Sequence, residues 1–133
     1  MSGRISPDDG APAAGDSHVL DHELVAMLDE MLTAPERERI LSRAQTQLKE
    51  LLDSLRDDWS RADLRSVERG AHQLAGLAGS VGCVRVTDLA RDIEIACRQS
   101  RRSEIQGQLD ALVQALPPAL DALELWRTKS AAD

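Results

Sequence analysis

No phenylalanine or tyrosine occurs in this sequence of 133 residues, and Trp59 and Trp126 are its only aromatic residues. A core without other aromatic side chains must be built from leucine, isoleucine, valine and alanine, which suits helix packing and disfavours a β-sandwich. Hydrophobic residues make up 42% of the chain, which is enough for one modest core. We therefore expect a single all-α domain in which both tryptophans are packing residues.

The chain also has no excess of positive charge and no long apolar run. Its formal net charge of −7 argues against a nucleic-acid partner, because phosphate contacts need clustered lysine and arginine. No run approaches the roughly 20 apolar residues of a membrane span, so we expect no direct membrane insertion, and no signal peptide is recognisable. Cys83 and Cys97 lack the spacing of metal ligands and are expected to be buried free thiols in a reducing cytoplasm.

Composition divides the chain into three parts. Residues 1–18 are rich in glycine, proline and alanine, and we predict a disordered leader or linker there. Residues 19–129 are predicted to form one helical bundle, and residues 130–133 a disordered tail.

Apolar residues recur at three- and four-residue steps in five segments, which predicts five helices. They span about 21–32, 35–58, 60–82, 84–99 and 103–128. Capping boxes are expected at Thr33 with Glu36 and at Ser60 with Asp63, and Gly82 suits a left-handed helix end. The pair Pro117-Pro118 is expected to kink or break the last helix. Short connections favour an antiparallel four-helix bundle with an additional short N-terminal helix at one end.

His72 is predicted to face solvent from the third helix. At about 100° per residue, His72 lies nearly opposite the apolar face of that helix, which consists of Val67, Ala71, Leu74, Ala78 and Val81. Histidine titrates near neutral pH, so an exposed imidazole offers a neutral nitrogen nucleophile. This placement disfavours the common alternative, a hydrogen-bonded core histidine.

Small residues follow His72 on the same predicted face: Ala75, Gly76 and Gly79. Glycine in a helix interior costs about 1 kcal/mol relative to alanine, so two of them on a solvent face suggest a cleared surface on which a partner lands. The alternative is close packing of a second helix against the patch. We favour the landing surface because the same face carries charged residues, Arg65, Glu68 and Arg69, although an ordinary solvated face would contain them too.

The stretch resembles the histidine-containing phosphotransfer domain of bacterial multistep phosphorelays. The motif positions in register are His72, Leu74, Gly76, Gly79, Gly82, Val86, Leu89, Ile93 and Glu94, with Ala71 before the histidine. Val19-Leu20-Asp21 with Leu24 and Leu28 also looks like the beginning of such domains in hybrid sensor kinases. The resemblance covers roughly residues 19–128.

The resemblance implies a phosphocarrier. In this family an imidazole nitrogen, here that of His72, accepts a phosphoryl group from a receiver-domain aspartate. The group is then exchanged, in either direction, with another receiver domain. Mg²⁺ belongs to the receiver, so no cofactor is expected on this chain, and the sequence has no ATP-binding motif that would support autokinase activity. The implied partners are a response-regulator receiver domain and a hybrid sensor histidine kinase. The residues expected to contact the phosphate or the partner are Arg65, Glu68, Arg69, Gln73, Ala75, Gly76 and Gly79.

One position departs from the family pattern. The family usually has lysine three residues after the histidine, where this chain has Ala75. Our hypothesis is that Arg69 partly substitutes for that lysine. The departure also keeps open a different function, a helical bundle that binds a receiver or kinase without being phosphorylated. A third alternative, an unrelated helical adaptor, is disfavoured by the outward histidine with glycine four and seven residues later.

Other polar residues give weaker signals. His18 and His22 are four residues apart but have no third ligand nearby, so we expect no metal site. Ser80 has no apparent base. We expect a cytoplasmic monomer, either free-standing or the C-terminal domain of a membrane-bound hybrid sensor kinase.

Overall fold

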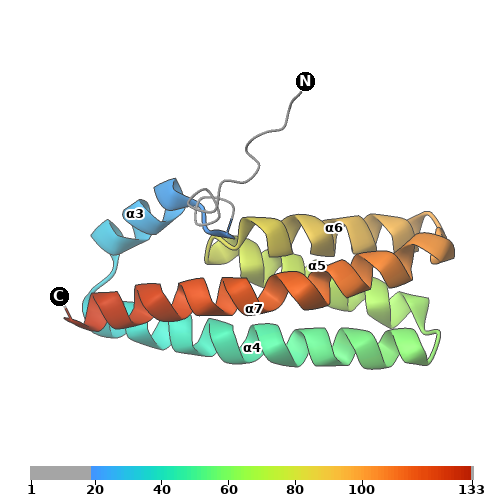
Figure 1. Ribbon diagram of the computed structural model, residues 1–133, viewed down its shortest axis with the longest axis horizontal. Helices are drawn as coiled ribbons and strands as arrows, with labels where there is room; N and C mark the ends of the chain where they lie inside the picture. Colours follow the sequence, from blue (N-terminus) through green and yellow to red (C-terminus); the bar gives the residue numbers. More distant parts are fainter. Residues whose placement is uncertain (1–18, 133) are drawn as a thin grey trace, which may run out of the picture.

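Five helices make up nearly all of residues 19–132, the part of the chain that the computed structural model describes. They are α3 (His22–Met31), α4 (Ala34–Ser60), α5 (Leu64–Ser80), α6 (Val84–Arg98) and α7 (Arg102–Ala132). Helices α4 to α7 lie side by side, and each runs opposite to the one before it (Figure 1). Both α4 and α6 pack against α5 and α7. The all-α prediction is confirmed, whereas the predicted leader, including His18, lies outside the described residues.

The core lies between α4, α5, α6 and α7 and is almost entirely aliphatic. Each helix contributes the apolar stripe that its sequence predicts. The largest fully buried side chains are Leu41, Leu48, Leu55, Val67, Leu74, Val81, Val86, Ile93, Ile105, Leu112 and Leu123. Both cysteines are also buried and unpaired, as predicted.

Capping boxes were predicted at the beginnings of α4 and α5. At α4, Thr33 Oγ1 accepts from the Glu36 backbone N–H at 3.2 Å, and Glu36 Oε1 accepts from the Thr33 N–H at 2.8 Å, which confirms the first box. The second box was wrong, because Ser60 is the last residue of α4. Asp63 caps α5 instead: its carboxylate accepts from the Ser66 backbone N–H at 3.2 Å and from the Ser66 hydroxyl at 2.7 Å, and these bonds lower the Asp63 pKa.

The short helix α3 is tied to the rest of the fold at both of its ends. Before its first turn, the Asp21 N–H donates to the Gly82 carbonyl oxygen at 2.8 Å. Near its last turn, Asp29 Oδ1 accepts from the indole Nε1 of Trp126 on α7 at 2.9 Å and forms an ion pair with Arg37 Nε of α4 at 3.3 Å. Trp126 is therefore a packing residue, as predicted, and it also anchors α3.

Helix α7 is longer than the sequence suggested. It continues through Pro117 and Pro118 to Ala132, so of the predicted kink or break the break does not occur, and residues 130–132 of the predicted tail are helical. Each proline removes one backbone N–H donor from the helix. Both prolines lie on the exposed side of α7, where water can hydrogen-bond the carbonyl oxygens that lose their donors.

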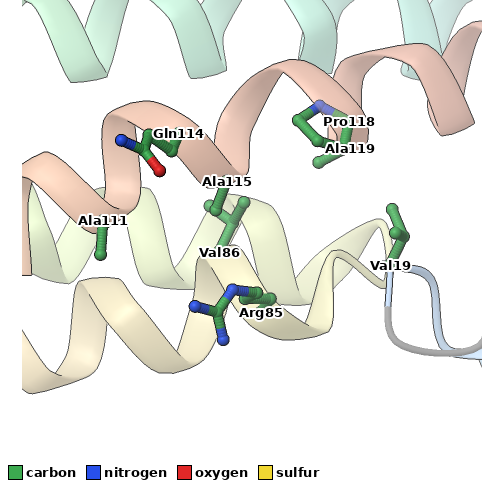
Figure 2. Close-up of a pocket in the computed structure, with 8 residues that line it drawn as sticks. All are labelled: Val19, Arg85, Val86, Ala111, Gln114, Ala115, Pro118 and Ala119. Carbon is green, nitrogen blue, oxygen red and sulfur yellow. The ribbon is translucent and has the colours of Figure 1, made fainter. Parts of the chain in front are cut away.

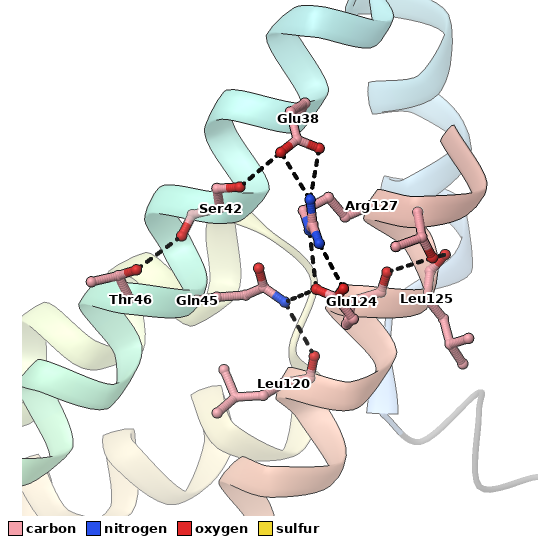
Figure 3. Close-up of polar contacts among 9 residues, drawn as sticks. Glu38, Ser42, Gln45, Thr46, Leu120, Glu124, Leu125 and Arg127 are labelled. Atoms are coloured by element: carbon pink, nitrogen blue, oxygen red, sulfur yellow. Dashed lines mark hydrogen bonds and ion pairs between the residues drawn. The ribbon is translucent and has the colours of Figure 1, made fainter. Parts of the chain in front are cut away.

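A group of charged and polar side chains joins α4 to α7 (Figure 3). The Arg127 guanidinium donates to Glu124 Oε2 at 2.6 Å and to both carboxylate oxygens of Glu38 at 2.9 and 3.0 Å. Gln45 Nε2 donates to Glu124 Oε1 at 3.0 Å. The hydrogen bonds from Arg127, and then the one from Gln45, lower the pKa of Glu124.

This lowered pKa predicts a pH dependence of stability. A carboxylate with a lower pKa in the folded chain than in the unfolded chain stabilises the fold above its ordinary pKa of about 4.3. That contribution disappears as the pH falls through the folded-state pKa. We expect urea denaturation from neutral pH to about pH 3 to show a smaller acid-dependent loss of stability for Glu124→Gln than for wild type. Asp53→Asn, at an exposed carboxylate of α4, is the control, and an unchanged pH profile for Glu124→Gln would contradict the prediction.

Gly82 connects α5 to α6 in a conformation that favours glycine. Its φ of +79° lies in the left-handed region, which costs other residues roughly 1–2 kcal/mol. An added Cβ would also lie 3.4 Å from the Asp21 backbone nitrogen.

We expect Gly82→Ala to lower the free energy of unfolding by about 1–2 kcal/mol. Gly107→Ala is the matched control, because nothing lies within 4 Å of its added Cβ in α7; it should instead stabilise the protein by up to about 1 kcal/mol. Chemical denaturation of both variants is the measurement.

Candidate functional site

His72 lies at the midpoint of α5 and points into solvent. The apolar face of the helix fixes this orientation, since Val67, Ala71, Leu74 and Ala78 are all fully buried in the core. The side chain of His72 is 75% exposed. The outward orientation predicted from the helical spacing is therefore confirmed.

The imidazole of His72 is held on one side by α6. Its Nδ1 lies 2.9 Å from Oε2 of Glu94, whose own side chain is only 13% exposed. An ionised carboxylate only accepts hydrogen bonds, so the proton of this bond resides on Nδ1. Among residues 19–129, the ring of His72 has no other hydrogen bond or ion pair. When the ring is neutral, its unprotonated nitrogen is therefore Nε2, which is the form in which an imidazole nitrogen is nucleophilic.

Glu94 belongs to a small charged network between α5 and α6. Arg98 NH2 donates to Glu94 Oε2 at 2.6 Å, and Arg98 Nε donates to Glu68 Oε2 at 3.3 Å. Glu68 therefore pairs with an arginine of α6. It does not pair with Arg65 or Arg69 of its own helix. Sequence reasoning recognised Glu94 as a motif position but assigned it no role. The four-residue spacing of Glu94 and Arg98 could have indicated their ion pair. The contact of Glu94 with His72 depends on the register between α5 and α6.

The predicted patch of small residues divides into two parts. Gly76 is exposed, and nothing lies within 4 Å of a Cβ added there. Gly79 faces α6, where an added Cβ would lie 3.7 Å from Thr87 Oγ1. Ala75 is only 4% exposed, so its predicted place in the open patch was wrong. The open surface beside His72 is centred on Gly76, and the other two small residues allow close helix packing.

The remaining predicted contact residues lie on α5, from its first turn to the residue after His72. Arg65, Arg69 and Gln73 are exposed on α5. Arg69 NH2 donates to the hydroxyl of Ser66 at 3.2 Å, one turn earlier in the helix. Gln73 lines a groove of about 440 Å³ between α5 and α4, together with Leu77, Gln47, Glu50, Leu51 and Ser54. Neighbouring residues of a helix point about 100° apart, so the groove lies on the α4 side of His72.

The two cysteines do not supply a competing nucleophile. Burial raises the pKa of the Cys83 thiol to about 12. Burial also raises the pKa of Cys97, and the negative charges of Glu68 and Glu94 raise it further. Both thiols are therefore protonated at neutral pH, and a protonated thiol is a poor nucleophile. Of these three side chains, only that of His72 is exposed.

Other features of the described residues lie elsewhere. Residues 19–132 contain no group of three histidine, cysteine or carboxylate side chains that could hold a metal ion. A cavity of about 360 Å³ opens between α6 and α7 (Figure 2). It is lined by Arg85, Gln114, Pro118 and mostly small apolar residues, and His72 is not among them. None of the helices in the described part of the chain is long and apolar enough to cross a membrane.

Comparisons with known proteins identify a family and a similar fold. The family model of the Hpt domain matches residues 39–126, which include His72, Glu94 and Arg98. The fold is similar to the crystal structure of histidine-containing phosphotransfer protein B from Pseudomonas aeruginosa PAO1. The TM-score is 0.79 at 19% sequence identity, and the match covers 90% of this chain and 98% of that chain. No curated protein sequence matches the chain.

Proposed function

Because the chain belongs to the Hpt domain family and is a histidine phosphotransfer intermediate of a phosphorelay, we propose that His72 is the residue that carries the phosphoryl group. The scaffold is an antiparallel four-helix bundle with α3 as an additional short helix. It holds the imidazole on a rigid element without contributing further chemistry. Hpt domains interact with receiver domains and kinases in phosphorelays, so the donor is the phosphorylated aspartate of a receiver domain and the acceptor is a second receiver.

The observation that carries this proposal is the contact between Nδ1 of His72 and the Glu94 carboxylate at 2.9 Å. With the proton on Nδ1, the lone pair of Nε2 attacks the phosphorus of the aspartyl phosphate. The N–P bond forms as the P–O bond to the aspartate breaks, and the aspartate leaves as a carboxylate. The phosphorylated ring keeps its Nδ1 proton and gains positive charge, which the Glu94 carboxylate stabilises. The reverse sequence returns the phosphoryl group to a receiver.

The surface around His72 suits a partner that brings its own phosphate-binding groups. Gly76 leaves room for a loop of the receiver, and the groove beside Gln73 and Leu77 accepts apolar and polar contacts. We propose that Arg65, Arg69 and Gln73 contact the receiver or the phosphate, with Arg69 partly replacing the lysine usual at position 75. Glu68 acts less directly, through Arg98. The Mg²⁺ of the reaction resides on the receiver, and the chain has no autokinase activity.

Two further properties are part of the proposal. The apolar stripes of α4 to α7 are buried within one chain, which favours a monomer. The unpaired thiols of Cys83 and Cys97 fit a reducing compartment, so we place the protein in the cytoplasm, either free-standing or as the last domain of a hybrid sensor kinase.

A second candidate function rests on Ala75. Without the lysine usual there, the bundle could bind a receiver or kinase without being phosphorylated. The methyl group of Ala75 is buried and carries no charge that could act on the phosphate. The engaged Nδ1 and open Nε2 of His72 favour the phosphocarrier over this alternative.

The test is transfer of phosphate from a receiver domain that carries labelled phosphate on its aspartate. We expect the label to move to this chain, to be acid-labile and alkali-stable, and to map to Nε2 of His72 by phosphorus NMR and peptide mass spectrometry. ATP alone should give no label. A stable complex with the receiver but no transferred label would favour the interaction module, and label on another residue would refute the assignment of His72.

A further inference from the structure

Arg98 contacts the same carboxylate oxygen as His72. On Glu94 Oε2, the Nδ1 of His72 lies at 2.9 Å and the Arg98 NH2 at 2.6 Å. Arg98 lies one turn after Glu94 in α6, and its Nε reaches across to Glu68 of α5 at 3.3 Å. The contacts link Glu68 of α5 to Arg98 of α6, and Arg98 to Glu94 of the same helix. Glu94 in turn contacts the imidazole of His72 on α5.

The orientation of Glu94 depends on these partners. Glutamate has three rotatable side-chain bonds, and its carboxylate loses hydration where the side chain is nearly buried. The Glu94 carboxylate accepts one hydrogen bond from the exposed ring of His72. This bond alone restrains the carboxylate only weakly. The Arg98 guanidinium adds a charge-assisted hydrogen bond from a planar group with several donors. Glu68 in turn restrains that guanidinium, although Arg98 is 59% exposed.

We propose that Arg98 is a positioning residue for phosphotransfer, which holds the Glu94 carboxylate against Nδ1 of His72 so that Nε2 stays unprotonated. The proposal rests on the proposed role of His72 and adds a residue that touches neither the phosphate nor the imidazole. Loss of Arg98 frees the Glu94 carboxylate to rotate toward solvent. The neutral ring then populates both tautomers, and in one of them the proton blocks Nε2.

The first test is the tautomer of His72 in Arg98→Gln, measured by two-bond ¹⁵N–¹H correlation NMR at a pH where the ring is neutral. We expect the wild type to show Nδ1 protonated and Nε2 unprotonated, and Arg98→Gln to show a mixture of both forms. Arg85→Gln is the matched control, because Arg85 is an exposed arginine of α6 that lines the cavity toward α7. It should keep the wild-type tautomer. A wild-type tautomer in Arg98→Gln would overturn the proposal.

The second test is the rate of phosphate transfer from a labelled receiver domain in a double-mutant cycle with Glu94→Ala. Arg98→Gln alone should slow transfer by about tenfold, the lower end of what loss of an orienting partner costs at ligating histidines. In the Glu94→Ala background it should have no further effect, because Arg98 acts through Glu94. Multiplicative losses in the cycle would overturn the proposal, since they indicate that Arg98 acts by another route.

These measurements separate the two proposals. The NMR tautomer does not require phosphate, so it tests the action of Arg98 even if His72 is not the phosphoacceptor. Label that persists in a His72→Gln protein would refute the role of His72 and leave the tautomer result standing. Thermal unfolding of Arg98→Gln verifies that each result comes from a folded protein.

Discussion

Replacing His72 with glutamine is expected to abolish phosphate transfer to this chain while leaving the fold intact. Glutamine has no nucleophilic nitrogen, so no N–P bond can form. The exposed side chain contributes little packing, and the glutamine amide can still donate to Glu94. We therefore expect the free energy of unfolding to change by less than about 0.5 kcal/mol. Transfer is measured with a labelled receiver domain, and stability with chemical denaturation and far-ultraviolet circular dichroism.

His22→Gln is the matched control for this substitution. His22 is also exposed, but it begins α3. Its variant should accept phosphate at the wild-type rate. A His72→Gln protein that still becomes labelled would show that another residue carries the phosphate. An unlabelled but unfolded His72→Gln protein is not expected, because the histidine side chain is 75% exposed.

The outward orientation of His72 could be predicted because it depends on one helix alone. The spacing of Val67, Ala71, Leu74 and Ala78 fixes which side of α5 is buried, and all four are buried. The same local information predicted the Thr33 capping box. It gave the wrong box at Ser60 because Asp63 and Ser66 form a competing cap three residues later.

The environment of Ala75 and the role of Glu94 could not be predicted in the same way. Both depend on how closely α6 approaches α5 and in which register. Ala75 lies between His72 and Gly79, which both face α6, and a small side chain at that position lets the neighbouring helix cover it. The contact of Glu94 with His72 joins residues from two helices, and no single-helix pattern contains it. The uninterrupted α7 also depends on its surroundings, since its prolines lie where water can replace the lost donors.

Enlarging Gly76 is expected to separate phosphotransfer from stability. An added Cβ meets nothing within 4 Å, so the fold has room for a larger side chain. Gly76→Ala should raise the free energy of unfolding by about 1 kcal/mol, because glycine is unfavourable in a helix interior. Gly76→Trp should also remain folded, but its indole lies one turn from His72 and obstructs the approach of a receiver. We expect it to slow transfer by about a hundredfold, since small errors in alignment of the reacting groups carry penalties of that size.

Gly107→Trp is the control that isolates obstruction from the general effect of a surface tryptophan. Gly107 is also an exposed helical glycine with an open Cβ position, but it lies on α7, which packs against α4 and α6. Its variant should transfer phosphate at the wild-type rate. Equal rates for Gly76→Trp and wild type would mean that the partner does not land on this surface. A slow Gly76→Trp protein whose His72 remains reactive toward a small phosphodonor would show that the open position at Gly76 serves the partner's approach, because the nucleophile itself is then unchanged.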